Sequence, residues 1–400
     1  MLSVERALQL VLAQARPLLP REVLAAESLG CVLAQAIVSD IDSPPHDKSI
    51  VDGYALFAAS AEQPGVELAI LEEVTAGAVP TRTVELGSAT RIMTGAPIPA
   101  GADAVVMVEQ TELASDRVRI LQAPIRPGQN IIRRAASLVK GQTVLAAGKR
   151  LRGIEMGLLA EVGRTSIAVV PRPRLAVLAT GNELVEPGQR PGPSQIRNSN
   201  GPLLQALAAE AGAVPVDLGI ARDDPADLRV KIERGLAEDV LVLSGGVSAG
   251  VLDLVPQALA ELGVEQVFHK VNLKPGKPLW FGVKRHDDGR QTLVFGLPGN
   301  PVSGLVCFEL FVRSAIQALS GREPIGLPRV AAVLTCEHHQ RGERPTYWPA
   351  LLAGESVTPL AWQGSGDLRT LSEANCLAHF PAGDRVFHKG EFIFAFVFNG

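Results

Sequence analysis

The feature that most constrains this fold is an alternation of apolar and helical segments between residues 171 and 325. Short continuous apolar runs predict buried strands, and apolar residues at helical spacing predict helices between them. The expected strands are 175–180, 214–220, 240–244, 267–271 and 291–295, and the expected helices are 200–211, 225–237, 254–262 and 303–319. This pattern predicts a doubly wound, mostly parallel sheet with helices on both faces.

The regions on either side of this segment have different patterns of apolar residues. Helices are expected at 3–15, where Ser3 can cap the first turn, at 21–28, and at 152–162. Residues 66–125 and the region from 326 onward contain only short β-like runs. The fold class is therefore α/β and multidomain: a central doubly wound, mostly parallel sheet domain, a β-rich inserted module and a small all-β C-terminal domain. The predicted domains are 1–40 with 127–170 (linker and dimerisation), 41–126 (β-rich), 171–325 (α/β) and 326–400 (barrel-like).

Four of the expected strands are followed by polar or glycine-rich loops. Because the carboxyl ends of parallel strands meet at one edge, these loops should gather there. The loops are 181–184, 244–250, 274–278 and 296–304. The last of them leads into a helix, whose free N–H groups suit an anion. Pro298 and Pro301 carry no donor and are expected to shape the pocket.

The residue types in these loops predict a cradle for a phosphate or another oxyanion. Glycines permit close backbone approach, hydroxyls donate hydrogen bonds and lysines supply positive charge. The candidates are Ser244, Gly245, Gly246, Ser248, Lys274 and Lys277. Glu183 and Asp253 at the same edge suit a hard divalent cation shared with phosphates. Each loop alone could equally be structural: a plain turn, a solvated lysine pair, or a helix cap formed by Glu183.

Composition excludes several classes of function. A net charge of −4 implies neither a nucleic-acid nor an anionic-membrane partner, and 4% aromatic residues argue against a stacking platform for single strands. No run of about 18 apolar residues predicts a membrane span, and no signal peptide is visible. The four cysteines lack a CxxC pair and are expected to be the reduced, mostly buried thiols of an intracellular protein.

Common catalytic signatures are also missing. The chain has no P-loop motif, no strict G-x-G-x-x-G and no HExxH. The seven histidines show no ligand spacing, and His338 and His339 are interpreted as surface residues. Asp52 and Thr94 lie outside the α/β segment in glycine-containing turns. If they are functional, they must reach the cradle from another domain or another subunit.

Seven motifs in this order resemble the MoeA family of molybdopterin molybdenumtransferases, which is related to the E domain of gephyrin. The resemblance covers nearly the whole chain. The motifs are 47–55, 91–106, 180–183, 244–250 with Asp253, 274–278, 296–303 and 363–366. The resemblance implies that molybdate is inserted into the dithiolene of adenylylated molybdopterin, that AMP is released, and that Mg²⁺ is required.

The resemblance also implies roles for individual residues. Glu183 and Asp253 would hold Mg²⁺ and phosphate, and Asp52 and Thr94 would line the cleft from the partner subunit of a homodimer. Contacts to phosphate, nucleotide or molybdate would come from Lys274, Lys277, Arg344 and Ser365. Further partners would be the molybdopterin adenylyltransferase and molybdoenzyme apoproteins, in the cytoplasm.

The sequence departs from the family pattern at several polar positions. The family's Gly-Glu-Asp after two arginines reads here Ala135-Ala136-Ser137, and its Gly-Asp-x-Asp reads Gly250-Val251-Leu252-Asp253. Pro349 stands where a second arginine is common. These losses raise an alternative: a degenerate paralogue that binds the pterin nucleotide or scaffolds assembly with little turnover. An unrelated phosphate-binding α/β enzyme is the third hypothesis.

Overall fold

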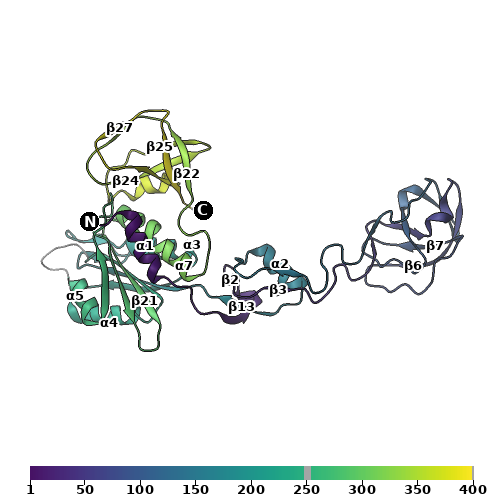
Figure 1. Ribbon diagram of the computed structural model, residues 1–400, viewed down its shortest axis with the longest axis horizontal. Coiled ribbons are helices and arrows are strands. Elements are labelled where there is room, and N and C mark those ends of the chain that lie inside the picture. Colours follow the sequence, from purple (N-terminus) through teal and green to yellow (C-terminus); the bar gives the residue numbers. More distant parts are fainter. Residues whose placement is uncertain (247–253, 399–400) are drawn as a thin grey trace. The chain divides into compact units, whose positions relative to one another are not determined.

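The computed structural model of this chain describes residues 1–246 and 254–398 (Figure 1). The chain divides into two compact units. The first contains Met1–Val23, Glu27–Ala34 and Ala168–Gly400, and the second contains Leu24–Ala26 and Gln35–Ile167. The division into four domains remains a prediction.

A six-stranded sheet forms the centre of the first unit, in the order β17-β14-β18-β21-β20-β19. Its strands are β14 Arg174–Thr180, β17 Val214–Ala221, β18 Val240–Ser244, β19 Val264–His269, β20 Trp280–Arg285 and β21 Gln291–Leu297. The first four in the order run parallel, as the alternation predicted. Strand β20 was not predicted; it pairs antiparallel with both β19 and β21.

The unpredicted strand does not disturb the gathering of the loops. Because β19 runs antiparallel to β20 and β20 runs antiparallel to β21, β19 has the same direction as β21. The loop from residue 270 to 279, with its two lysines, therefore leaves the sheet at the carboxyl edge of β21. This is the edge at which the switch-point rule places ligands.

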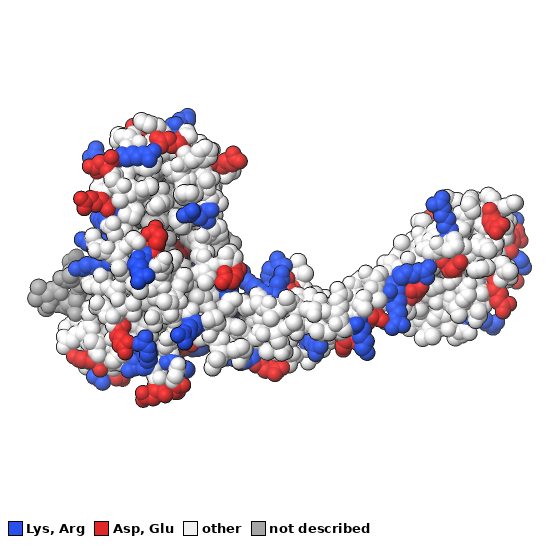
Figure 2. All heavy atoms as spheres, in the orientation of Figure 1, with Lys and Arg blue, Asp and Glu red and all other residues white. Residues whose placement is uncertain are grey.

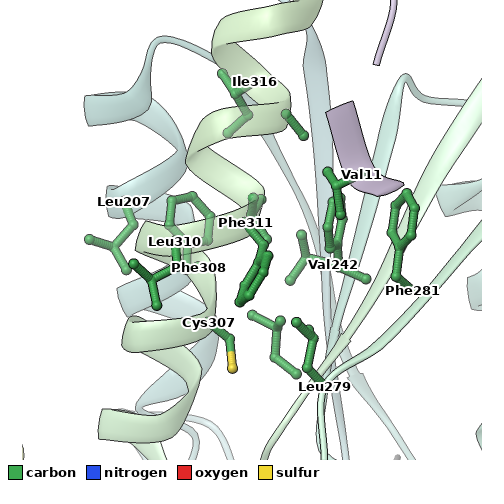
Figure 3. Close-up of a cluster of buried hydrophobic side chains, with 14 of the residues drawn as sticks. Val11, Leu207, Val242, Leu279, Phe281, Cys307, Phe308, Leu310, Phe311 and Ile316 are labelled. Atoms are coloured by element: carbon green, nitrogen blue, oxygen red, sulfur yellow. The ribbon is translucent and has the colours of Figure 1, made fainter. Parts of the chain in front are cut away.

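Helices cover both faces of this sheet. On one face pack α1 Val4–Gln14, α3 Asn200–Ala211 and the continuous helix Pro301–Leu319, and on the other α4 Pro225–Gly235 and α5 Leu254–Glu261. The continuous helix consists of α6 Pro301–Cys307, a π-helical segment Phe308–Val312 and α7 Arg313–Leu319. Figure 3 shows Phe308 and Phe311 of this helix in the core with Val242, Leu279 and Phe281 of the sheet side.

The predicted N-cap at Ser3 is confirmed, Asp224 caps a second helix, and one predicted helix is wrong. The Ser3 hydroxyl accepts from the backbone N–H of Arg6 at 3.2 Å, and the Asp224 carboxylate accepts from that of Asp227 at 2.9 Å. Residues 21–28 instead form β1 Arg21–Leu24 and a 3₁₀ turn, Ala25–Glu27. Strand β1 joins β13 Ser166–Val170, which also pairs with β2 Val32–Leu33. This tertiary pairing overrides the weak local helix preference.

A small closed barrel forms the C-terminal part of the first unit, and its strand-rich character was predicted. The barrel contains β22 Arg329–Leu334, β25 Ser356–Pro359, β24 Thr346–Ala353, β26 Cys376–Phe380 and β28 Phe392–Val397. Beside it lies a two-stranded ribbon of β23 His338–Gln340 and β27 Arg385–Phe387. A short helix that the sequence analysis missed, α8 Leu368–Glu373, follows the Ser365 loop.

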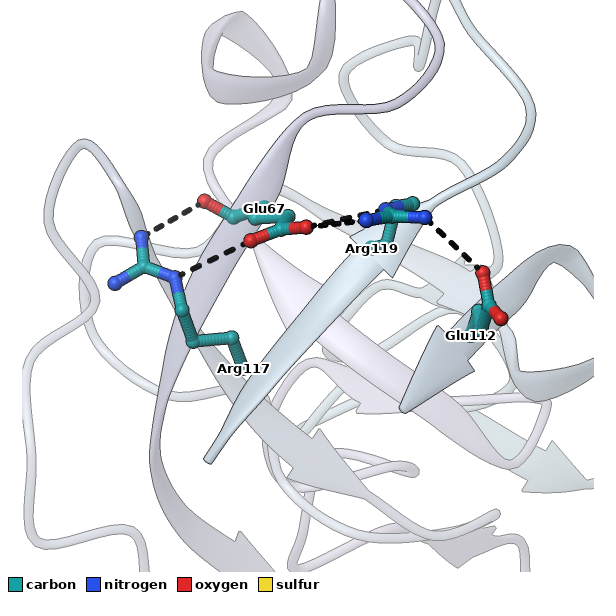
Figure 4. A network of polar contacts seen from close by, with 4 residues as sticks. All are labelled: Glu67, Glu112, Arg117 and Arg119. Atoms are coloured by element: carbon teal, nitrogen blue, oxygen red, sulfur yellow. Dashed lines mark hydrogen bonds and ion pairs between the residues drawn. The ribbon is translucent and has the colours of Figure 1, made fainter. Parts of the chain in front are cut away.

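The second unit contains a six-stranded sheet in the order β8-β5-β7-β6-β10-β9. The elements of this unit are β3 Ile37–Val38, β4 Lys48–Ser49, β5 Gly53–Leu56, β6 Glu67–Val74, β7 Ser88–Ile92, β8 Ala104–Met107, β9 Thr111–Ala114, β10 Arg117–Ile120, β11 Ile131–Ile132, β12 Thr143–Leu145 and α2 Gly153–Glu161. Near its β9 edge, Glu67 bridges Arg117 and Arg119, and Arg119 reaches Glu112 (Figure 4). Charges at a sheet edge oppose pairing with other chains.

The surface carries charges of both signs, and the cysteines are mostly buried, as the sequence analysis predicted. Figure 2 shows acidic and basic side chains interspersed over the face in view of each unit. All four cysteines are free thiols; Cys31, Cys307 and Cys376 are buried and Cys336 is exposed. Within the described residues, only the helix Pro301–Leu319 is long and apolar enough to cross a membrane, and it is buried inside the first unit.

The buried helix Pro301–Leu319 carries an ion pair inside the core. Glu309 and Arg313 are each 2% exposed, and the guanidinium donates to both carboxylate oxygens, at 2.5 and 2.8 Å. Burial raises the pKa of the Glu309 carboxyl, and the hydrogen bonds from Arg313 offset part of this rise. A buried pair of this kind is costly to break from one side because the remaining charge has no partner.

We therefore expect Glu309→Gln to destabilise the first unit by about 3–5 kcal/mol. The double variant Glu309→Leu/Arg313→Met should recover most of this loss, because it removes both charges together. Urea unfolding followed by tryptophan fluorescence measures this unit, since Trp280, Trp348 and Trp362 all belong to it. The exposed pair Arg229–Glu233 is the matched control, and Glu233→Gln should cost less than about 0.5 kcal/mol. Equal losses of unfolding free energy in Glu309→Gln and Glu233→Gln would contradict the prediction.

One alanine places backbone strain in the second unit. Ala135 has a φ of +60°, which lies in the left-handed region that favours glycine. Its neighbours are held in place, because Arg133 binds the Asp47 carboxylate at 2.6 Å and Arg134 binds Asp42 at 2.6 Å. A left-handed conformation costs an alanine roughly 1–2 kcal/mol relative to glycine.

Ala135→Gly should therefore stabilise the second unit by up to about 1 kcal/mol, the relief of strain exceeding the added entropy of the unfolded chain. Differential scanning calorimetry measures the change. Ala136→Gly is the matched control, because Ala136 does not have a positive φ, and it should destabilise slightly. A loss of stability in Ala135→Gly would refute the proposed backbone strain at Ala135.

Candidate functional site

Two of the predicted loops meet at the carboxyl edge of the sheet. The side-chain amide of Asn200 donates to the Ser244 hydroxyl and to the Gly299 carbonyl, each at 2.7 Å. The backbone N–H of Gly245 donates to the carbonyl of Leu297 at 3.1 Å. Asn200, at the start of α3, was missed in the sequence analysis because it lies on a helix and in none of the four loops. It joins the Ser244 loop to the loop that contains Pro298 and Pro301.

The glycines in this junction are required by space as well as by conformation. Gly245 has a φ of +93°, and a Cβ there would lie 2.7 Å from the carbonyl oxygen of Thr180. Gly246 has a φ of +64°, and a Cβ there would lie 2.7 Å from a Val255 methyl group. Both glycines are therefore required by the packing of this loop, and their predicted close approach to a ligand remains a prediction. Ser248 and Asp253 lie outside the described residues, so their predicted roles remain predictions.

Glu183 lies at the same edge, after β14. Its exposed carboxylate folds back over Gly181: a Cβ on Gly181 would lie 2.4 Å from the Glu183 Oε2 atom. No group of three or more His, Cys, Asp or Glu side chains among the described residues could hold a metal ion. A single carboxylate nevertheless suits Mg²⁺, which is commonly bound through one or two carboxylates together with substrate phosphates.

A second feature is a cavity of about 460 Å³ between the Lys274 loop, the start of helix Pro301–Leu319 and the barrel. It brings together four predicted residues, Lys274, Lys277, Arg344 and Ser365. Its other lining residues are Pro275, Gly276, Pro278, Ser303, Trp348, Trp362, Gln363 and Gly364. Three cations and no carboxylate thus line it among the described residues. Such a lining favours an anion with several oxygen atoms.

Backbone hydrogen bonds fix the cationic side of this cavity. The N–H of Lys274 donates to the Pro345 carbonyl at 2.9 Å, and the N–H of Tyr347 donates to the Lys274 carbonyl at 2.8 Å. The Arg344 guanidinium donates to the Leu273 carbonyl at 3.2 Å. The Lys274 loop is therefore joined to the first residues of β24, which hold Arg344 beside the two lysines.

Hydrogen bonds from the first turns of helix Pro301–Leu319 hold two loops of the cavity in place. The N–H of Val302 donates to the Ser365 carbonyl at 3.0 Å, and the Cys307 thiol donates to the Gly276 carbonyl at 3.4 Å. A Cβ on Gly276, whose φ is +118°, would lie 2.6 Å from the Cys307 sulfur. The Asp367 carboxylate accepts from the N–H of Thr370 at 3.1 Å and from that of Gln363 at 3.1 Å, which holds the Ser365 loop closed.

The sequence analysis missed Trp348 and Trp362 as lining residues. Their rings lie 4.9 Å apart at 89°. They are separated in the sequence and belong to no recognised motif, so only the folded barrel brings them together. The one available signal was their closeness in the sequence to two predicted residues: Trp348 follows Arg344 by four residues, and Trp362 precedes Ser365 by three.

His338 was interpreted as a surface residue, and this is wrong. Its ring is 9% exposed, stacks on Phe380 at 3.8 Å, and meets the Trp348 ring edge-on at 4.8 Å. Its Nε2 atom has no hydrogen-bond partner among the described residues. Burial, with contributions from His339 and Lys274, lowers the pKa of His338 to about 4. His339 is exposed, as expected.

Asp52 and Thr94 lie in the second unit and contact one another. The backbone N–H and the hydroxyl of Thr94 both donate to Asp52 Oδ1, each at 2.7 Å. These bonds, the backbone bond foremost, lower the pKa of the Asp52 carboxyl. The two predicted residues therefore form one small polar cluster, with a carboxylate that is ionised at neutral pH.

Comparisons with known proteins match nearly the whole chain. Family models described as "MoeA N-terminal region (domain I and II)", "Probable molybdopterin binding domain" and "MoeA C-terminal region (domain IV)" match residues 2–163, 176–318 and 331–394. A molybdopterin molybdenumtransferase of Nostoc sp. is 37% identical over 90% of this chain and 85% of its own length. One from Staphylococcus epidermidis is 32% identical over 98% of this chain and 94% of its own.

Solved structures agree with these relatives. Two structures of a molybdopterin biosynthesis MoeA protein from Pyrococcus horikoshii cover all of this chain and all of their own. Their TM-scores are 0.82 and 0.80, at 32% and 28% sequence identity. The similarity therefore extends over the whole architecture.

Because the folded state resists protonation of His338, the first unit should lose stability as the pH falls below the unfolded-state pKa of about 6.5. The loss should continue down to a pH of about 4, the folded pKa. His338→Phe removes the titrating group and with it this loss. Between pH 7.5 and pH 5.5 the free energy of unfolding of the wild type should therefore fall by on the order of 1 kcal/mol more than that of the variant. Urea unfolding by tryptophan fluorescence at the two pH values measures the difference. His339→Gln should keep the wild-type pH dependence; a variant His338→Phe that does the same would refute the effect.

Proposed function

The chain belongs to the MoeA family of molybdopterin molybdenumtransferases, and on this premise we propose that it inserts molybdate into adenylylated molybdopterin and releases AMP. It is a transferase whose role lies in molybdenum cofactor biosynthesis. The three family models leave few residues unmatched, and this does not favour the degenerate paralogue.

The cavity with Lys274, Lys277, Arg344 and Ser365 carries this proposal. Molybdate is a tetrahedral dianion, so its oxygen atoms need charge-assisted donors from several directions. Two ammonium groups, one guanidinium and one hydroxyl line the same space without a carboxylate among the described residues. The backbone bonds of Lys274 and Tyr347 fix the loop before the ligand arrives, which reduces the ordering cost of binding.

The junction of the Ser244 and Pro298 loops suits the nucleotide phosphates. Gly245 and Gly246 carry no side chain that would keep phosphate oxygens from the backbone N–H groups, and the Ser244 hydroxyl can donate to the same oxygens. Glu183 would hold Mg²⁺ together with those phosphates, and Asp253 would be its second ligand. When bound, Mg²⁺ would neutralise charge on the pyrophosphate that is cleaved. The protein's own contribution is to position both substrates and to match their negative charges.

Further parts of the proposal rest on the family resemblance. The chain acts as a homodimer in the cytoplasm, and the Asp52–Thr94 cluster of one subunit completes the cleft of the other. The molybdopterin adenylyltransferase supplies its substrate, and molybdoenzyme apoproteins receive its product. Pro349 supplies no charge here: it is buried in β24 opposite Leu377 and does not line the cavity. The three cations of the cavity must therefore suffice.

The test is to incubate the purified protein with adenylylated molybdopterin, molybdate and Mg²⁺ and to follow AMP release. We expect release that depends on both molybdate and Mg²⁺. Lys277→Ala should raise the KM for molybdate by about 10- to 100-fold, since a hydrogen bond to a charged group contributes roughly 1.5–3 kcal/mol.

Lys389→Ala is the matched control, because Lys389 is exposed on the barrel and outside the cavity, and it should leave the KM unchanged. Tight nucleotide binding without AMP release by the wild type would support the degenerate paralogue. No binding of the pterin nucleotide would point to an unrelated phosphate-binding enzyme.

A further inference from the structure

The cavity has an aromatic side that a simple oxyanion does not need. The chain has only three tryptophans, and two of them, Trp348 and Trp362, line this one cavity. Both rings are partly exposed. The third, Trp280, is 2% exposed in the sheet and donates to Gln266 at 2.9 Å. The two cavity indoles are therefore distinguished by accessible ring surface beside positive charge.

Both cavity indoles are held in fixed orientations. Trp348 Nε1 donates to the Leu360 carbonyl at 2.8 Å, and Trp362 Nε1 donates to the Gly364 carbonyl. His338 packs against the Trp348 ring from the barrel side. Because each indole N–H is already satisfied by backbone, the rings cannot turn over without losing a hydrogen bond. They present carbon surface, rather than polar atoms, to whatever enters.

The volume of the cavity also exceeds the needs of a single tetrahedral anion. Pockets for organic ligands are commonly about 300–1,000 Å³, and this cavity, of about 460 Å³, falls within that range. Its lining combines cations with perpendicular aromatic rings. That combination matches a ligand with both a negative group and a flat ring, because indole faces and edges stack on heteroaromatic rings.

From this juxtaposition we propose that Trp348 and Trp362 bind a flat heteroaromatic ring of the substrate while Lys274, Lys277 and Arg344 bind its attached phosphate or the oxyanion. This inference rests on the proposed function, which supplies two such rings, the pterin and the adenine. Both indoles line the space for the ring, and Trp348 also holds Trp362 in its perpendicular orientation.

Isothermal titration calorimetry of the full chain tests the proposal with four probes. AMP and dihydroneopterin triphosphate carry a ring and phosphate, ribose 5-phosphate carries phosphate without a ring, and molybdate is an oxyanion alone. Trp362→Ala should weaken binding of AMP or of the pterin by about 5- to 100-fold and leave ribose 5-phosphate and molybdate within about twofold. The probe that loses affinity identifies the ring. Trp362→Phe should largely restore binding, because it keeps an aromatic face.

A second measurement avoids altering the cavity. In Trp280→Phe the remaining indoles are the two that line the cavity, so the ring-bearing probe should quench tryptophan fluorescence and ribose 5-phosphate should not. Equal weakening of all four probes in Trp362→Ala, or no ring-specific quenching, would overturn the proposal. The AMP-release assay on the wild type separates the two hypotheses: release without ring-specific binding refutes the aromatic role alone.

Discussion

Burial of the helix Pro301–Leu319 is the constraint on which the candidate site depends. The helix packs in the core of the first unit, so the position of its first turn is set by the sheet and by α1 and α3. From that turn Val302 holds the Ser365 loop, and one further turn along Cys307 holds the Lys274 loop at Gly276. Two loops that are about ninety residues apart in the sequence are thus fixed to one rigid support. The same helix contains the buried Glu309–Arg313 ion pair, whose two charges cost free energy to remove from water.

The sequence predicted most of the framework because the framework follows local rules. The helical period of apolar residues identified α3 and α4, and continuous apolar runs identified the parallel strands. Strand β20 was missed because the sequence predicted a parallel sheet, whereas β20 pairs antiparallel with both β19 and β21. Whether such a segment forms a strand depends on the neighbouring strands more than on its own residue pattern. The helix expected at 21–28 failed for the same reason, since β1 exists only through its pairing with β13.

The site was predictable to a different extent. Lys274, Lys277, Arg344 and Ser365 were chosen separately, and the fold brings all four to one cavity. Asn200, Trp348 and Trp362 could not be chosen, because their roles arise from contacts across the fold. His338 shows the limit most clearly: two adjacent histidines look alike in the sequence, but strand alternation on β23 buries one and exposes the other. Low aromatic content argued against stacking, yet two tryptophans placed together suffice for one ring.

The segment from Gly299 to Ser303, which ends in the first turn of α6, connects the two halves of the site. On one side Gly299 accepts the Asn200 bond that fixes the Ser244 loop, and on the other side Ser303 lines the cationic cavity. The four Cα-to-Cα steps from Gly299 to Ser303 span at most about 14 Å even when extended, and the start of the helix at Pro301 shortens that distance. The proposed phosphate cradle and the proposed oxyanion cavity therefore share one wall. On the proposed function, a substrate that carries a nucleotide at one end and a metal-accepting group at the other would occupy both at once, which is the geometric requirement for transferring molybdate onto it.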